Sequence, residues 1–134
     1  MLSLEDLQKK IIAFRDARDW KQFHTPKDLA VGLSLEAGEV LEHFHWKNDA
    51  EIAEHIKNHK EEIGDELADV LNYMLLMAHD FDIDLFAATL RKIEKTAQKY
   101  PPNRFNSFPD SVSKTKIPKL PTVSILLPSG ENDT

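Results

Sequence analysis

The fold prediction depends on two short stretches of the sequence, Leu35-Glu36-Ala37-Gly38-Glu39-Val40-Leu41 and Asp65-Glu66-Leu67-Ala68-Asp69-Val70-Leu71. They align at an offset of 30 residues, and each has an acidic pair at positions i and i+3, followed by Val-Leu. Because successive helical residues are separated by about 100° around the axis, each pair lies beside the apolar stripe of its helix. The repeat therefore predicts two amphipathic helices with paired carboxylates at matching positions.

Capping residues and prolines predict where the helices begin and end. Ser3 with Asp6 caps a first helix, Thr25-Pro26 begins a second, and Pro101-Pro102 ends the last. We expect helices from residue 4 to about 19, from 26 to about 47, from the Asn58-His59-Lys60-Glu61 start to about 79, and from about 84 to 100. Residues 20–25 are expected to form a loop, and residues 49–57 a short helix or a helical extension.

The composition agrees with a single all-α domain. The 134 residues are 41% hydrophobic and 30% charged, and four glycines are few for the tight turns of an all-β fold. Six of the seven prolines lie at or after Pro101, so we expect an all-α domain over residues 1–100 and a Pro-rich tail over residues 101–134. The expected fold is a four-helix bundle, and its third helix should bury Leu67, Val70, Leu71, Met74, Leu75 and Ala78.

Charge and residue usage exclude several classes of protein. The first hundred residues carry 20 acidic and 13 basic side chains, which disfavours binding to a nucleic acid polymer. The absence of cysteine removes disulfides, thiolate zinc sites and cysteine nucleophiles. No apolar run is long enough to span a membrane and no signal peptide is evident, so a cytoplasmic protein is expected.

The four repeated acids, Glu36, Glu39, Glu66 and Asp69, predict a metal site. In an antiparallel helix pair joined through residues 48–57, their carboxylates would face each other at one level. Gathering like charges beside a core is unfavourable unless a cation compensates them, and Mg²⁺ prefers such oxygen ligands, with Mn²⁺ as a substitute. Gly38 within the first pair suggests close approach by a helix or a ligand. The alternative is that both pairs are solvated helix faces.

Other nucleotide and metal motifs are missing from the sequence. There is no GxxxxGK[ST] and no GxGxxG, which excludes the usual glycine-rich phosphate loops. A di-iron bundle needs two Glu-x-x-His helices, and the sequence has one such motif, Glu42 to His45. His55, His59 and Glu62 could hold zinc, but they would lie on an exposed polar face. We therefore interpret the histidines as surface residues.

The run Arg18-Asp19-Trp20-Lys21-Gln22-Phe23-His24-Thr25-Pro26, the two acidic pairs and His45-Trp46 resemble the MazG-like nucleotide pyrophosphohydrolases. The likeness covers roughly residues 4–101 and is strongest to the small branch that includes dCTP pyrophosphatases. It implies an all-α, four-helix fold assembled as a homotetramer, or dimer of dimers. It also implies Mg²⁺-dependent hydrolysis of a nucleoside triphosphate to the monophosphate and pyrophosphate.

The resemblance implies roles for individual residues. Glu36, Glu39, Glu66 and Asp69 would be catalytic metal ligands, and Glu39 is our candidate for orienting or deprotonating the attacking water. The substrate-binding positions would be Trp20, His24, Trp46, Tyr73, Lys92, Lys99 and Tyr100. Thr96 stands where the family pattern around Lys92 and Lys99 has Asn.

Two classes of function remain open at this point. One is a nucleoside triphosphate pyrophosphatase, acting on dCTP or another deoxynucleotide in nucleotide pool cleansing. The other is a non-catalytic helical protein that has kept the fold and binds a nucleotide or a protein partner. Hydrolysis that disappears with a chelator would distinguish them.

Overall fold

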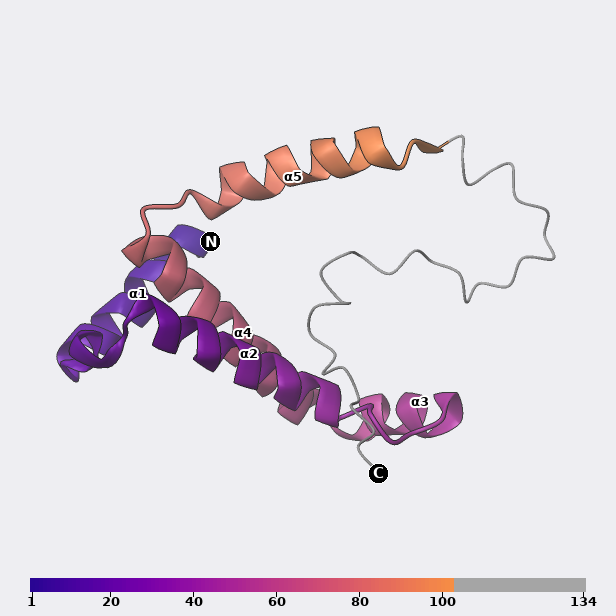
Figure 1. The fold of residues 1–134 in the computed structure, drawn as a ribbon. Helices are drawn as coiled ribbons and strands as arrows, with labels where there is room; N and C mark the ends of the chain where they lie inside the picture. Colours follow the sequence, from indigo (N-terminus) through magenta and orange to yellow (C-terminus); the bar gives the residue numbers. More distant parts are fainter. Residues whose placement is uncertain (103–134) are drawn as a thin grey trace, which may run out of the picture. The chain divides into compact units, whose positions relative to one another are not determined.

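The structure is a computed structural model, and it describes residues 1–102. These residues form α1 (Leu4–Ala17), the 3₁₀ helix η1 (Trp20–Phe23), α2 (Pro26–Glu42), α3 (Asp49–Asn58), α4 (Lys60–Asp80) and α5 (Leu85–Lys99) (Figure 1). No strand occurs within this part of the chain, which confirms the all-α prediction. The predicted tail, residues 101–134, lies outside the described residues from residue 103 onward, and the division at residue 100 stays a prediction.

The predicted starts of the first two helices are confirmed in detail, whereas the expected cap of the third is wrong, because Asn58 ends α3 and no side chain caps α4. Ser3 and Asp6 form a reciprocal capping box, and Thr25 accepts a hydrogen bond from the backbone of Asp28 with Pro26 in the first turn. Each of these caps satisfies backbone N–H groups that the helix itself leaves unpaired. Local sequence therefore determines where α1 and α2 begin.

The second predicted helix was too long. α2 ends at Glu42 rather than near Lys47, because His43 and Phe44 donate to carbonyls three residues back and the chain turns away. The side chain of Asn48 then caps α3, which is a helix in its own right rather than an extension of α2. With α3 counted separately, the described chain has five α-helices instead of four. The expected loop at residues 20–25 contains the 3₁₀ helix η1.

α2 and α4 pack side by side in opposite directions (Figure 1). Leu29 of α2 is 1% exposed, and Leu75, Leu76 and Ala78 of α4 are buried with it. Of the other residues expected in the core, Val70 and Leu71 are half-buried, whereas Leu67 is 53% and Met74 36% exposed. Leu67 and Met74 lie on a side of α4 that its neighbours leave open.

A buried ion pair fastens α1 to α4. Arg15 is 1% exposed, and its guanidinium donates to both carboxylate oxygens of Asp80, at 2.8 and 2.9 Å. Gln8, two turns earlier on α1, donates to the backbone carbonyl of Leu75 at 3.0 Å. Specific polar contacts therefore supplement apolar packing in setting how α1 lies on α4.

The described chain consists of two units, residues 1–85 and a second one that begins at Phe86. α5 belongs almost entirely to the second unit and presents large apolar side chains: Phe86 is 70%, Leu90 53% and Ile93 60% exposed. Spacings of four and three residues place these three on one face of the helix. None of the helices within residues 1–102 is long and apolar enough to cross a membrane.

Candidate metal centre and substrate site

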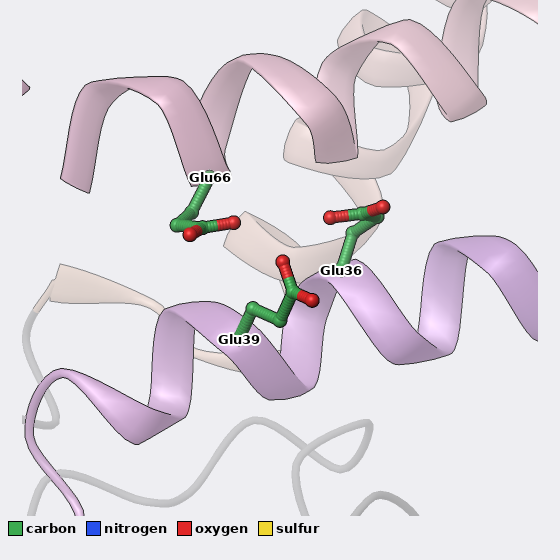
Figure 2. Close-up of side chains that lie close together, drawn as sticks. All are labelled: Glu36, Glu39 and Glu66. Carbon is green, nitrogen blue, oxygen red and sulfur yellow. The ribbon is translucent and has the colours of Figure 1, made fainter. Parts of the chain in front are cut away.

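Three of the four predicted metal ligands meet between α2 and α4. Glu36 and Glu39 lie one turn apart on α2, and Glu66 lies on α4 opposite them. One carboxylate oxygen of each lies within 4.8 Å of the others, and Figure 2 shows the three side chains pointing toward one another. The antiparallel arrangement predicted from the 30-residue repeat is what brings them together.

The carboxylate of Glu36 is the most enclosed of the three. Its Oε2 atom is buried and has no hydrogen-bond partner among the described residues. Burial, followed by the charge of Glu39, its hydrogen bond and the charge of Asp69, raises the pKa of Glu36 above its ordinary value. A buried carboxylate oxygen is costly without a partner, and within residues 1–102 no group donates a hydrogen bond to this one.

The carboxyl group of Glu66 is perturbed more strongly. A side-chain hydrogen bond with Glu39 is the largest cause, and burial and the charges of Glu39, Asp69 and Glu36 add to it. Together they raise the pKa of Glu66 to about 7. A raised pKa means that Glu66 holds its proton to a higher pH than an ordinary glutamate, which reduces the repulsion within the cluster.

Asp69 lies outside the group of three carboxylates within mutual reach. It follows Glu66 by one turn on α4 and is exposed, yet its negative charge contributes to the raised pKa values of both Glu36 and Glu66. Asp69 is therefore a fourth carboxylate next to the cluster, and its part as a ligand stays a prediction.

This cluster, Glu36, Glu39 and Glu66, fits a divalent cation in three respects. Its donors are all carboxylate oxygens, the set preferred by Mg²⁺ and Mn²⁺. Their separation is short enough for shared coordination, and Glu36 contributes a buried oxygen that has no partner in the part of the chain that the structure describes. A bound cation would replace the proton of Glu66 and remove the mutual repulsion.

The predicted substrate residues of the first unit lie in different surroundings. Trp20, 44% exposed, packs edge-on against Phe14 at 5.6 Å between ring centroids. His24 caps the end of η1, and its Nδ1 atom is buried without a hydrogen-bond partner in the described chain. Trp46 is 88% exposed and touches His45 edge-on. Trp46 therefore has exposed ring surface that a ligand could contact, and His24 has a ring nitrogen that could bind one.

Tyr73 packs within the helix pair. Its ring covers the backbone of Gly32 on α2, so that a side chain at Gly32 would overlap the ring carbons. The sequence suggested a close helix approach at Gly38 and gave no such expectation for Gly32. A Cβ at Gly38 would meet nothing within 4 Å. The suggested helix approach at Gly38 is therefore wrong within the described chain. Gly32 could have been found from the sequence, because it is a second glycine inside the same predicted helix and glycine is unfavourable there.

Lys92 and Lys99 lie on α5, and Tyr100 follows that helix directly. The Nζ atom of Lys99 lies 5.5 Å from the centre of the Tyr100 ring, a cation–π distance. All three belong to the second unit, and their part in substrate binding stays a prediction.

Residues 31–108 match the MazG-like family, and this segment includes every residue of the carboxylate cluster. The chain belongs to the MazG-like family. Among MazG-like relatives, it is 39% identical to rat (Rattus norvegicus) dCTP pyrophosphatase 1 over 101 residues, which cover 74% of this chain and 59% of the rat protein. It is 35% identical to human (Homo sapiens) dCTP pyrophosphatase 1 over 121 residues, covering 89% of this chain and 68% of the human protein.

The fold is also similar to a solved structure. A pyrophosphatase from Archaeoglobus fulgidus DSM 4304 superimposes with a TM-score of 0.71 at 40% sequence identity. The match covers 75% of this chain and 94% of the archaeal one. By contrast, this MazG-like chain spans about three fifths of the rat relative's length.

Proposed function

We propose that this MazG-like chain is a Mg²⁺-dependent nucleoside triphosphate pyrophosphohydrolase. The observation that carries the proposal is the cluster of Glu36, Glu39 and Glu66, in which a buried carboxylate oxygen has no partner among residues 1–102. The dCTP pyrophosphatase relatives and the archaeal pyrophosphatase support the reaction type. Pool cleansing of deoxynucleotides is the role we assign to it.

The carboxylates have distinct tasks in this proposal. Glu36, Glu39 and Glu66, with Asp69, would hold Mg²⁺, which would supply positive charge to the phosphate oxygens and lower the pKa of water. Glu39 is the exposed member of the cluster, so it is placed to orient a water and accept its proton. The water oxygen attacks the α-phosphorus, the bond from that phosphorus to the bridging oxygen breaks, and pyrophosphate leaves. Lys92 and Lys99 balance its charge.

The proposed substrate is dCTP or another deoxynucleoside triphosphate, because the relatives are named for dCTP. Trp20 and Trp46 offer ring faces on which a base can stack. The partly free surface of both rings and the unpaired Nδ1 atom of His24 support this assignment. Tyr73 and Tyr100 complete the proposed set of binding residues, with no nucleic acid polymer as substrate.

We also propose that the chain assembles as a homotetramer, a dimer of dimers, in the cytoplasm. The apolar face of α5, formed by Phe86, Leu90 and Ile93, is the kind of surface that oligomer interfaces bury. Light scattering coupled to size exclusion measures the assembly directly. A monomer at micromolar concentration would contradict it.

Pyrophosphate release from each canonical dNTP and NTP, with Mg²⁺ or with chelator, tests the proposed reaction. Glu39→Gln and Glu66→Gln should each lower turnover at least about 100-fold, since even outer-shell partners of metal ligands cost about 10–100-fold. Helical content measured by circular dichroism should stay unchanged, because glutamine has nearly the same shape as glutamate.

Glu61→Gln is the matched control. Glu61 is an exposed acid in the first turn of α4, outside the cluster, and this variant should turn over like the wild type. Wild-type rates in both cluster variants would contradict the proposal. Absence of any hydrolysis with Mg²⁺ or Mn²⁺ would favour the alternative, a non-catalytic helical binding protein.

A further inference from the structure

Two histidines far apart in the sequence meet at the end of α2. Nδ1 of His43, the residue that caps the C-terminus of α2, lies 2.8 Å from Nε2 of His55 on α3. The distance is that of a direct hydrogen bond, so one proton lies between the two ring nitrogens. Both side chains are half-buried. These histidines are therefore not the independent surface residues that the sequence predicted.

The surroundings hold His55 in place and leave room beside it. The ring of His59 stacks on that of His55 at 4.2 Å between centroids and 16° between planes. The Nδ1 atom of His59 lies 3.2 Å from the backbone carbonyl of His55. An open hollow next to His55 is lined by Lys47, Ala50, Glu51, Glu54, Asn58 and His59. His55 itself forms part of this lining, so one side of its ring is open to solvent.

We propose that His43 and His55 form a second metal site, for a transition-metal ion of the Zn²⁺ type, separate from the carboxylate cluster. The ion takes the place of the shared proton, which moves to the other ring nitrogen of the imidazole that donated it, so both ligands are neutral imidazoles with one N–H each. Imidazole nitrogen suits Zn²⁺, Ni²⁺ and Cu²⁺ and is a poor ligand for Mg²⁺. The two sites therefore differ in the ions they select.

The geometry needs a small adjustment to accept the ion. Tetrahedral zinc with Zn–N bonds of about 2.0–2.1 Å holds two nitrogens about 3.3 Å apart. The observed 2.8 Å therefore has to open by about half an ångström, which a slight rotation of the His43 or His55 side chain supplies.

Neighbouring groups shift the pKa of His55 in opposite directions. Burial, then His59, Lys47 and His43, lower the pKa of His55, while Glu62 raises it. A lower pKa favours the neutral imidazole, which is the form that binds a metal ion. Lys47 weakens cation binding and Glu62 strengthens it. With two protein ligands and water in the other positions, we expect binding in the micromolar range.

The test is equilibrium dialysis of the full chain against Zn²⁺ in excess Mg²⁺, followed by elemental analysis. The wild type should bind one more zinc ion per chain than either His43→Gln or His55→Gln. His45→Gln is the matched control, because His45 is an exposed histidine two residues from His43 and lies outside the pair. It should bind as many ions as the wild type.

A thermal unfolding series gives a second readout that does not depend on ion counting. Zn²⁺ should raise the midpoint of the wild type and of His45→Gln, and it should raise that of His43→Gln less, since the ion joins α2 to α3 only in the intact pair. Equal zinc stoichiometry in the wild type and both pair variants would overturn the proposal. Loss of the ion in His45→Gln as well would also overturn it, because binding would then belong to surface histidines in general.

Discussion

The ring of Tyr73 fills the space that a side chain at Gly32 would occupy. A Cβ placed at Gly32 would overlap two carbons of the ring and lie 2.8 Å from its hydroxyl oxygen. Gly32 precedes Glu36 by one turn on α2, and Tyr73 follows Asp69 by one turn on α4. The contact therefore sets the spacing of the two helices next to the carboxylate cluster.

Gly32→Ala should destabilise the protein by about 1–3 kcal/mol, because the added methyl group has to displace the ring or separate the helices. Gly38→Ala and Gly64→Ala are matched controls, since a Cβ at either position meets nothing within 4 Å. Both should gain up to about 1 kcal/mol from the better helix propensity of alanine. Urea unfolding of the three variants measures this. A Gly32→Ala variant as stable as the controls would show that the ring moves away freely.

Arg15→Met should be among the most destabilising single changes in α1. It leaves the carboxylate of Asp80, whose side chain is 14% exposed, without the partner that lowers its pKa. Breaking a buried pair in this way typically costs about 3–5 kcal/mol. Lys9→Met is the control, because Lys9 and Glu5 form an exposed pair at 3.6 Å whose loss should cost under about 1 kcal/mol. Similar unfolding free energies for both variants would contradict the structural role of Arg15.

The carboxyl group of Glu66 should contribute less to the stability of the metal-free protein as the pH rises from about 4.5 to about 7. Glu66 has a pKa raised from 4.5 to about 7 in the folded protein. Within this window the folded state holds a proton that the unfolded state has lost, so stability falls with pH. His55 has the opposite effect, because its lowered pKa makes the folded state less stable below the ordinary histidine range.

Comparison with Glu66→Gln isolates the contribution of the acid. In chelator, the slope of unfolding free energy against pH should be more negative for the wild type than for Glu66→Gln, while His55 acts equally in both. Mg²⁺ should flatten the wild-type slope by replacing the proton. Parallel curves for the two proteins would mean that Glu66 titrates normally.

Nucleotide binding should change the fluorescence of Trp46 more than that of Trp20. The sequence has two tryptophans, so Trp20→Phe and Trp46→Phe each leave one reporter. Trp46 is 88% exposed, and stacking of a base would both shield and quench it. The measurement is a titration with Mg²⁺ and a dCTP analogue whose bridge between the α- and β-phosphates cannot be hydrolysed. Saturable binding without a change in the Trp20→Phe protein would contradict stacking on Trp46.

The parts of this fold that local chemistry determines could be predicted from the sequence. The caps at Ser3 and Thr25 were correct because they involve residues three positions apart. The meeting of Glu36, Glu39 and Glu66 was also predictable, since a repeat with matched phase needs only the antiparallel pairing of two helices. Both inferences use helix geometry and little else.

Contacts between distant residues could not be predicted in this way. Arg15 follows Leu7 and Ile11 at four-residue spacing on the predicted apolar stripe of α1, but its partner, Asp80, lies 65 residues away. Arginine is usually exposed, so composition gives no sign of this pairing. The contact of His43 with His55 likewise depends on how α3 turns back toward α2, a feature of the connection rather than of either helix.

The carboxylate cluster lies within a single helical hairpin. Its members come from α2 and α4, which α3 connects in the sequence. Contacts between residues close in sequence form early in folding, so we expect the hairpin to close before α1 docks through Arg15 and Asp80. Like charges then oppose the closing step itself. Mg²⁺ should accordingly speed refolding in stopped-flow experiments, and equal refolding rates with and without the ion would place the closure after the rate-limiting step. If Mg²⁺ does speed refolding, the cation proposed to take part in catalysis would also help to assemble the site that binds it.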